Sequence, residues 1–209
     1  MYVGVTGATG KIGRWLVREL LDRGHRVRAM TRPVRDGFWG NTSPAVAELE
    51  GWGAEIFYAD FADDDSLARF AQGIEVLIHN GYHHVNEDHH PVEWTYMNIL
   101  ATVKLYEAFW KPGGKQIIFI SSGAVYGRGP LYEEERFGKV SLPIDERTLT
   151  APRGLYAVYK STIEHTTVVF KTVHGIKPST SLRPGSGAGL GQLLGYRCYD
   201  DDGVLTGEI

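Results

Sequence analysis

The sequence has one cysteine, almost no net charge and no long apolar run. Cys198 stands alone among 209 residues, so an internal disulfide is excluded and a reducing compartment is expected. With 22 basic and 25 acidic residues, the formal net charge of −3 provides no general attraction for nucleic acid. No apolar run approaches the roughly 20 residues that a membrane-spanning helix needs. These absences predict a cytoplasmic protein with no nucleic-acid or membrane partner.

The segments that are present alternate between short apolar strands and helical patterns. This alternation is typical of an α/β fold in which a doubly wound parallel sheet, a Rossmann fold, is covered by helices on both faces. Because the first strand begins at once, no signal peptide is expected. We expect strands at 1–7, 26–31, 55–58, 76–79, 116–120 and 177–182, and helices at 11–23, 45–52, 65–70, 92–110 and 156–173.

Two of the expected helices show an apolar pattern at helical spacing. In the helix at 11–23 the pattern consists of Ile12, Trp15, Leu16, Leu20 and Leu21. In the helix at 92–110 the residues expected to face inward are Tyr96, Ile99, Val103, Leu105 and Phe109.

Three glycines, Gly7, Gly10 and Gly13, lie between the first strand and the first helix. In such a strand–turn–helix unit a dinucleotide pyrophosphate sits on the helix N-terminus. Gly7 permits the tight turn, Gly10 lets the backbone approach the phosphates, and Gly13 lets the helix pack closely on the strand. The triplet alone is a weak signal, but its place between strand and helix predicts dinucleotide binding. Further contacts are expected from the neighbouring Thr9, Lys11 and Ile12.

The end of the second strand bears on the choice of cofactor. Thr31 and Arg32 stand where NAD-binding folds often place an acidic residue for the ribose 2′-hydroxyl. A guanidinium can bind a 2′-phosphate bidentately, and Arg14 could add a second positive charge. We therefore expect NADP, with NAD as the alternative; the competing interpretation is that these arginines are solvated. Asp60 is either an adenine ligand or a turn residue. The expected cofactor contacts also include Phe61, Asn80 and Gly81.

The second half of the chain carries the candidate chemistry. Tyr156 and Lys160 are four residues apart, so on a helix they share one face. A free tyrosine has a pKa of about 10, and a nearby ammonium lowers such a pKa toward the range useful for acid–base catalysis. Ser122 follows the fifth strand and is placed to hydrogen-bond a substrate oxygen. Tyr159 lies out of register with Lys160, so we expect it to be a packing residue whose change to Phe is nearly silent.

These motifs together resemble the extended short-chain dehydrogenase/reductases of the NAD-dependent epimerase/dehydratase kind. The resemblance covers residues 1–185 and is carried by five segments: Thr6–Gly13, Asn98–Thr102, Ser121–Gly127, Pro152–Lys160 and Leu182–Gly185. It implies that residues 1–185 form a dinucleotide-binding domain and that 186–209 are the remnant of a C-terminal substrate lobe. It also implies a homodimer formed through the two long helices, with Tyr96, Leu100, Val103, Val168 and Val169 as candidate contacts.

The resemblance assigns roles to individual residues. Tyr156 would be the general acid/base, and Lys160 would tune its pKa and bind the cofactor ribose. Ser122 would orient the substrate, and Asn98 would support the proton relay. Arg183 would begin the segment that passes the nicotinamide amide.

The chain also departs from the family pattern. Family members usually carry small apolar residues after the fourth strand, where this chain has His79, Asn80 and Gly81. The interval from Ser122 to Tyr156 is longer than is typical, which predicts a surface insertion beside the substrate pocket. About two dozen residues follow residue 185, fewer than the usual substrate lobe contains, so we expect this lobe to be either reduced or incomplete, the chain then being a fragment.

A histidine-rich stretch raises the question of a metal site, because histidine and carboxylate side chains are metal ligands. Its histidines are adjacent pairs in an expected loop rather than one face of a helix. We therefore favour a polar loop over the active-site mouth and expect no metal. The residues concerned are His79, His83, His84, Glu87, Asp88, His89 and His90.

The expected reaction is reversible hydride transfer at a carbon of a small-molecule substrate that bears a hydroxyl or carbonyl group. Return of the hydride to the other face gives epimerisation of a substrate such as a sugar nucleotide. A hydride that stays transferred gives NADP-dependent reduction of a ketone or aldehyde, which Arg32 favours. A third possibility is a non-catalytic NADP sensor, against which the joint presence of Ser122, Tyr156 and Lys160 argues.

Overall fold

The computed structural model describes residues 1–32, 43–83, 91–127, 146–176 and 179–184, together with the backbone of two strands at 197–199 and 205–208. Among these residues no helix is long and apolar enough to cross a membrane.

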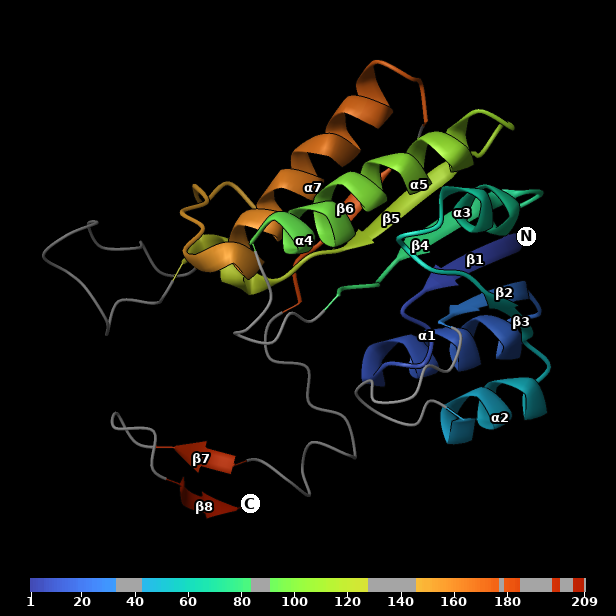
Figure 1. Cartoon of the computed structure of the whole chain (residues 1–209), viewed down its shortest axis with the longest axis horizontal. Helices are drawn as coiled ribbons and strands as arrows, with labels where there is room; N and C mark the ends of the chain where they lie inside the picture. Colours follow the sequence, from blue (N-terminus) through green and yellow to red (C-terminus); the bar gives the residue numbers. More distant parts are fainter. Residues whose placement is uncertain are drawn as a thin grey trace, which may run out of the picture.

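A parallel sheet of six strands forms the centre of the protein, in the order β3-β2-β1-β4-β5-β6 (Figure 1). The strand order reverses between β1 and β4, and in open parallel sheets a ligand binds at the carboxyl ends beside such a reversal. The expected doubly wound α/β fold is therefore confirmed. The strands are β1 (Tyr2–Thr6), β2 (Arg26–Thr31), β3 (Glu55–Tyr58), β4 (Val76–His79), β5 (Gln116–Ile120) and β6 (Thr180–Leu182).

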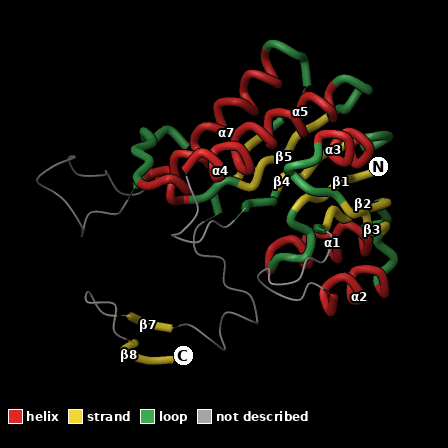
Figure 2. The backbone as a smooth tube through the Cα atoms, in the orientation of Figure 1, coloured by secondary structure: helices red, strands yellow, loops and turns green. Residues whose placement is uncertain are grey.

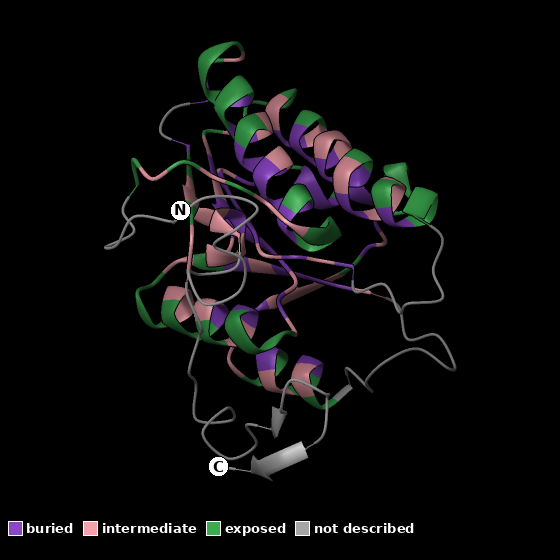
Figure 3. Ribbon diagram, turned by 90° about the vertical axis from the view of Figure 1, so that its left-hand side faces the viewer, coloured by how far each residue is buried: buried purple, intermediate pink, exposed green. Residues whose placement is uncertain are grey.

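Helices cover the sheet on both faces, as the tube drawing makes clear (Figure 2). On one face lie α1 (Lys11–Asp22) and α2 (Ser43–Gly51); on the other lie α3 (Asp64–Ala71), α4 (Pro91–Thr95), α5 (Ala101–Trp110) and α7 (Gly154–Thr172). Each layer has its own apolar core: Val17 and Leu49 pack with β1 and β2, whereas Phe70, Leu105 and Ile163 pack on the opposite face. The buried sides of the helices accordingly face the sheet (Figure 3).

The expected helix at 92–110 is interrupted by a π-helical turn, η1, at Tyr96–Leu100. The wider turn shifts the register of the side chains, so Tyr96, Ile99 and Val103 are only half-buried, while Leu105 and Phe109 are buried as predicted. The shift turns Asn98 inward, where it is almost fully buried. Such π-turns inside helices are frequent at functional sites, because they redirect one side chain.

Helix α1 rests on the sheet through a narrower face than its apolar pattern suggests. Its buried residues are Gly13 and Val17, whereas Ile12 is 42% exposed and Trp15 is 57% exposed. A Cβ atom at Gly13 would lie 2.1 Å from the carbonyl oxygen of Gly7, so the helix packs on the turn backbone to backbone. This close packing turns Ile12 and Trp15 away from the core.

The C-terminal part of the chain differs from the prediction in two ways. The last parallel strand spans only Thr180–Leu182, and residues 177 and 178 lie outside the described part of the chain. An antiparallel pair, β7 (Arg197–Tyr199) and β8 (Leu205–Glu208), lies in the expected remnant lobe. The expected insertion between Ser122 and Tyr156 falls mostly on residues 128–145, which are not described.

Candidate functional site

The glycine turn meets the loop after β4 at the point where the strand order reverses. Gly7 adopts the left-handed φ of +63°, and a Cβ atom there would lie 2.9 Å from the Cα of Gly81. Among the described residues, a Cβ at Gly10 would meet only the Gly7 carbonyl oxygen, at 3.3 Å. The two loops therefore touch through backbone atoms, and Gly10 marks the open side of the turn.

The N-terminus of α1 is suited to an anion. Its N-cap residue, Gly10, makes no side-chain capping bond, and the first turn holds no acidic residue. The first amide groups of a helix have no partner within the helix, and the helix dipole favours negative charge there. The cradle of uncapped amides beside three glycines therefore fits a pyrophosphate. Thr9, Lys11 and Ile12 lie at this end of α1, with Lys11 and Ile12 exposed.

The loop after β4 is tied to the glycine turn by two hydrogen bonds. Asn80 donates from Nδ2 to the carbonyl oxygen of Gly7 at 3.2 Å, and the Gly81 amide donates to Thr6 Oγ1 at 2.9 Å. The Phe61 ring supports the loop, since a Cβ at Gly81 would lie 3.0 Å from its edge. The structure thus brings together Phe61, Asn80 and Gly81, three predicted cofactor contacts from two different loops.

His79, the last residue of β4, is fully buried beneath this loop. Its Nδ1 lies 2.8 Å from Thr6 Oγ1, and its Nε2 lies 3.0 Å from Thr102 Oγ1 and 3.2 Å from the Tyr159 hydroxyl. Burial, with a smaller contribution from the charge of Lys160, lowers the pKa of His79 to about 3. His79 is therefore a neutral imidazole near pH 7.

Helix α7 carries the predicted catalytic pair. Tyr156 is 39% exposed, whereas Lys160 is 3% exposed and donates from Nζ to the carbonyl oxygen of Ile120 at 2.7 Å. The ammonium nitrogen lies 5.6 Å from the Tyr156 ring centre and 4.9 Å from that of Phe119. Burial lowers the pKa of Lys160 to about 8, against the opposing effect of Glu164. The pair thus combines an accessible phenol with a buried cation on one helix face.

Tyr82 forms a wall of this site that the sequence patterns did not indicate. Its ring stands edge-on to Tyr156, with 4.9 Å between centroids, and is tilted against Tyr159 at 5.3 Å. Its hydroxyl accepts a hydrogen bond of 3.0 Å from Nε1 of the buried Trp94. Burial raises the pKa of Tyr82, so this phenol is held protonated at neutral pH. Tyr82 therefore positions the Tyr156 ring from the side of β4.

Ser122 and Asn98 make bonds within the chain that define their orientation. Ser122 Oγ accepts from the Ala124 amide at 3.1 Å and so caps the short 3-10 turn η2 (Gly123–Tyr126), which packs against α7. Asn98 accepts from the His83 amide at 2.8 Å and donates to the carbonyl oxygens of His83 and Trp94, each at 3.1 Å. Asn98 thereby fixes the loop after β4, and the substrate and relay roles of both residues stay predictions.

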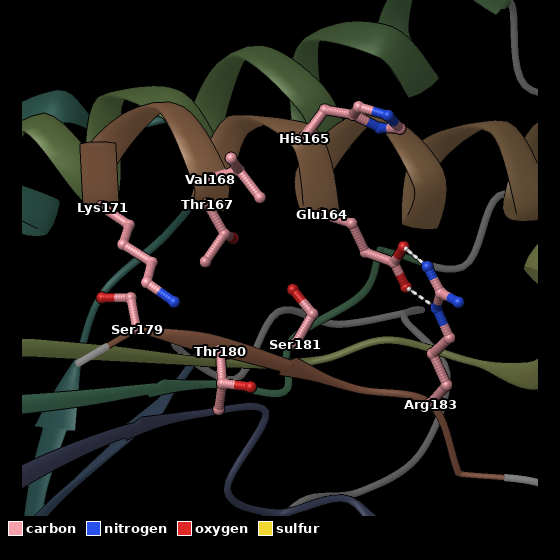
Figure 4. A pocket seen from close by; sticks show the side chains of 9 residues that line it. All are labelled: Glu164, His165, Thr167, Val168, Lys171, Ser179, Thr180, Ser181 and Arg183. Atoms are coloured by element: carbon pink, nitrogen blue, oxygen red, sulfur yellow. Dashed lines mark hydrogen bonds and ion pairs between the residues drawn. The ribbon is translucent and has the colours of Figure 1, made fainter. Parts of the chain in front are cut away.

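Arg183 connects β6 to α7. Its guanidinium donates to Glu164 Oε1 at 2.8 Å and Oε2 at 2.7 Å, and to the Tyr126 hydroxyl at 2.7 Å. Glu164 also accepts a 2.5 Å hydrogen bond from Ser121. Figure 4 shows the Arg183–Glu164 pair closing one end of a groove of about 280 Å³ between α7 and β6, with Lys171 toward the other end. These bonds give Arg183 a structural role, and its predicted cofactor contact stays a prediction.

The structure says less about the residues expected to recognise the adenosine part of the cofactor. Arg32 follows β2 and is half-buried. Arg14 pairs with Glu48 of α2 at 2.8 Å, so part of its charge is neutralised locally. Asp60 accepts from the Ala62 amide at 2.9 Å, which bears out its interpretation as a turn residue. Its alternative role as an adenine ligand stays a prediction.

The histidine-rich stretch supplies no metal site in the described part of the chain. Among the described residues no group of three or more His, Cys, Asp or Glu side chains is arranged to hold a metal ion. His79 ends β4, as expected from the strand predicted at 76–79, and belongs to the hydrogen-bond network under the loop. His84, Glu87, Asp88, His89 and His90 lie outside the described residues.

Comparison with known proteins agrees with this geometry. The sequence profile of the NAD dependent epimerase/dehydratase family matches residues 3–195. The chain belongs to this family. It is 31% identical over 172 residues to sterol demethylase protein B of Methylococcus capsulatus, covering 82% of this chain and 47% of that protein. It is 29% identical over 182 residues to uronate dehydrogenase of Pseudomonas syringae, covering 87% of this chain and 58% of that protein.

Solved structures of epimerases share the fold. UDP-glucose 4-epimerase of Thermus thermophilus, in complex with NAD, superposes with a TM-score of 0.69 at 28% identity, over 88% of this chain and 54% of that one. UDP-glucuronic acid 4-epimerase of Bacillus cereus, in complex with UDP-glucuronic acid and NAD, gives a TM-score of 0.70 at 26% identity, over 88% and 56%. The chain therefore spans about half the length of these relatives.

The first prediction concerns the acid stability of this family member. Since the pKa of His79 is about 3 in the folded protein and about 6.5 in the unfolded chain, the unfolded state binds the extra proton between these values. The stabilisation is thus complete above pH 6.5 and is lost as the pH falls toward 3. Urea unfolding of the wild type and of His79→Gln should show a steeper decline below pH 6.5 in the wild type. Parallel pH profiles would contradict the buried neutral histidine.

Proposed function

We propose that the protein is an NAD(P)-dependent enzyme of the epimerase/dehydratase type, acting at a hydroxyl or carbonyl carbon of a small molecule, such as a sugar nucleotide. The observation that carries the proposal is the pairing of an accessible Tyr156 with a buried Lys160 on one face of α7. Both stand at the carboxyl edge of the sheet, to which the glycine turn also belongs. The family match and the two NAD-bound epimerase structures support the same reaction class.

The roles proposed for this chain's residues are cofactor binding and proton transfer. The uncapped first turn of α1 would hold the pyrophosphate, and Gly81 and Asn80 would flank it. When bound, a nicotinamide cofactor supplies or takes up a hydride. Tyr156 would give or take the hydroxyl proton of the substrate, and the Lys160 ammonium would favour the phenolate form electrostatically. Ser122 would orient the substrate oxygen beside Tyr156.

A net oxidation or reduction is the second candidate. The uronate dehydrogenase of Pseudomonas syringae, 29% identical, carries an oxidoreductase name rather than an epimerase one. An epimerase regenerates its cofactor in each cycle, whereas a dehydrogenase or reductase changes its redox state. Absorbance of the reduced cofactor, followed while sugar nucleotides, uronates and small carbonyl compounds are screened, separates the two. Product chromatography is needed for the epimerase case, in which the absorbance returns to its starting value.

Substitution of the proposed acid/base gives a direct test. Tyr156→Phe keeps the ring and removes the proton donor, so turnover should fall by about 10² to 10⁴ while the fold and cofactor affinity survive. Tyr106→Phe is the matched control, because this fully buried tyrosine bonds only across the core, to Thr167. Turnover is measured with whichever substrate the screen identifies. A Tyr156→Phe enzyme as active as the Tyr106→Phe control would refute the assignment.

Cofactor choice is proposed to favour NADP. In the sequence, Thr31 and Arg32 occupy the end of β2, where NAD-binding folds often carry an acidic residue, and Arg14 stands at the start of α1. Glu48 holds Arg14 in an ion pair, which neutralises part of the charge that Arg14 could offer to a 2′-phosphate.

Arg32→Asp should reverse this preference. Placing a carboxylate there would repel the 2′-phosphate and accept from the 2′-hydroxyl, so NADPH should bind about tenfold more weakly and NADH more tightly. Fluorescence titration of both cofactors measures the change, with Arg23→Asp on the far end of α1 as the control for net charge. Equal affinity of the wild type for NADH and NADPH would count against the proposal.

We also propose a symmetric homodimer. Leu100, Val168 and Val169 are exposed on the two long helical segments, and a shallow groove on α7 is bordered by Val158 and Val169. Exposed apolar side chains gathered on neighbouring helices are typical of an interface between copies. Tyr96 and Val103 are half-buried at the margin of this surface.

Light scattering tests the assembly. The wild type should have the mass of a dimer at micromolar concentration, and Val169→Glu should shift it toward the monomer by burying a charge. Glu50→Gln, which changes an exposed charge on α2 on the opposite face of the sheet, is the control. A monomeric wild type would overturn the proposal.

A further inference from the structure

Four hydrogen bonds form a closed ring around the backbone of Gly81. The Gly81 amide donates to Thr6 Oγ1 at 2.9 Å, and Thr6 Oγ1 lies 2.8 Å from His79 Nδ1. His79 Nε2 lies 3.2 Å from the Tyr159 hydroxyl, which donates to the Gly81 carbonyl oxygen at 3.2 Å. The ring joins the last residue of β1, the last residue of β4 and helix α7 at one glycine.

The hydroxyl groups around the imidazole indicate its tautomer. The Tyr159 hydroxyl donates to the Gly81 carbonyl oxygen, and the Thr102 hydroxyl donates to the Asn98 carbonyl oxygen at 2.6 Å. With both protons engaged in this way, the two hydroxyl oxygens near Nε2 accept, and we assign the hydrogen to Nε2. The Thr6 hydroxyl, which accepts from Gly81, then donates to an unprotonated Nδ1. Each of the four residues in the ring donates one of these hydrogen bonds and accepts another. Hydrogen bonds in such a cyclic chain reinforce one another.

Gly81, which this ring of hydrogen bonds holds, lies between the glycine turn and the Tyr156 site. The Cα of this glycine faces Gly7 so closely that a Cβ on Gly7 would lie 2.9 Å from it. Tyr159 contacts the Tyr82 ring, which in turn stands edge-on to Tyr156. A shift of Gly81 would therefore disturb both the glycine turn and the wall of the Tyr156 site. The charge of Lys160, whose Nζ lies 5.2 Å from the Tyr159 ring centre, acts on the imidazole.

We propose that His79 is a positioning residue: as the neutral Nε2–H imidazole it locks the Gly81 backbone between Thr6 and Tyr159, and so sets the glycine turn against the catalytic helix. The proposal rests on the proposed function, because only a dinucleotide at this turn makes the position of Gly81 matter for binding. It also replaces our expectation that Tyr159→Phe is silent, because this change opens the ring.

The experiment compares members of the ring with buried residues outside it. Thr6→Val removes the hydroxyl while keeping the shape of the side chain. Thr6→Ser keeps a hydroxyl at this position and should therefore retain the hydrogen-bond ring. Tyr159→Phe is matched by Tyr106→Phe, and Thr6→Val by Thr167→Val, because the Tyr106 and Thr167 hydroxyls bond to each other outside the ring of hydrogen bonds. The Tyr106 side chain touches His79 through its aromatic ring, which Phe keeps. If Thr6→Val does not fold, the two tyrosine variants decide the test.

Two readouts on the full chain are independent of turnover. Nitrogen NMR of His79 should show an unprotonated Nδ1 and a protonated Nε2 that do not titrate between pH 8 and 5. Amide exchange of Gly81 should accelerate about threefold to tenfold in Thr6→Val and Tyr159→Phe, the effect of losing one buried hydrogen bond. Both controls and Thr6→Ser should exchange at the wild-type rate. The affinity for NADPH, measured by fluorescence, should fall in the same two variants by a similar factor.

The outcomes separate the two claims. A protonated Nδ1, or Gly81 exchange that changes no more in the ring variants than in the controls, overturns the lock. Unchanged NADPH affinity in variants whose Gly81 exchange has accelerated would overturn its importance for the cofactor turn. Failure of the wild type to bind NADPH or NADH would contradict the proposed function alone, since the NMR readouts still decide whether the lock exists.

Discussion

The close approach of three backbone segments at the reversal of strand order is the constraint on which the rest of the site depends. Gly7, Gly13 and Gly81 meet there with no room for a side chain: a Cβ on Gly13 would lie 2.1 Å from the Gly7 carbonyl oxygen. Overpacking of this kind costs stability, because neither backbone can give way as a side chain could. The contact brings the N-terminus of α1 and the loop after β4 to the same edge of the sheet.

The polar groups beneath this contact are satisfied almost entirely within the protein. Thr6, His79, Thr102 and Tyr159 bond to one another and to main-chain groups, so burial does not leave them without partners. The environment of Lys160 differs from that of these groups. It is buried among aromatic rings with one carbonyl partner, and its pKa falls to about 8. A cation held so close to its titration point is typical of a functional site rather than of a structural ion pair.

Much of the fold could be predicted from the sequence because its signals are local. The alternation of apolar strands with helical patterns, together with the glycine triplet, predicted the parallel sheet and the place of the site. The register of Tyr156 and Lys160 was likewise visible from spacing alone. The π-turn at Tyr96–Leu100 was not, because the apolar residues on both sides of it still fit a continuous helix.

The interactions that the sequence did not reveal join residues far apart in the chain. His79 stood out as a polar residue ending an apolar strand, but its partners Thr6, Thr102 and Tyr159 lie 73, 23 and 80 residues away. Tyr82 belongs to none of the sequence motifs, and its role in positioning Tyr156 follows from the contact between their rings. Side-chain networks of this kind follow from tertiary packing, which spacing does not encode.

The measurement that tests the central claim most directly is a crystal structure of the full chain with NADPH. We predict that the diphosphate lies on the amides of the first turn of α1, between Gly10 and Gly81, and that the nicotinamide ring lies beside Tyr156. A diphosphate bound elsewhere, such as the groove between Lys171 and Arg183, or a nicotinamide directed away from α7, would contradict it.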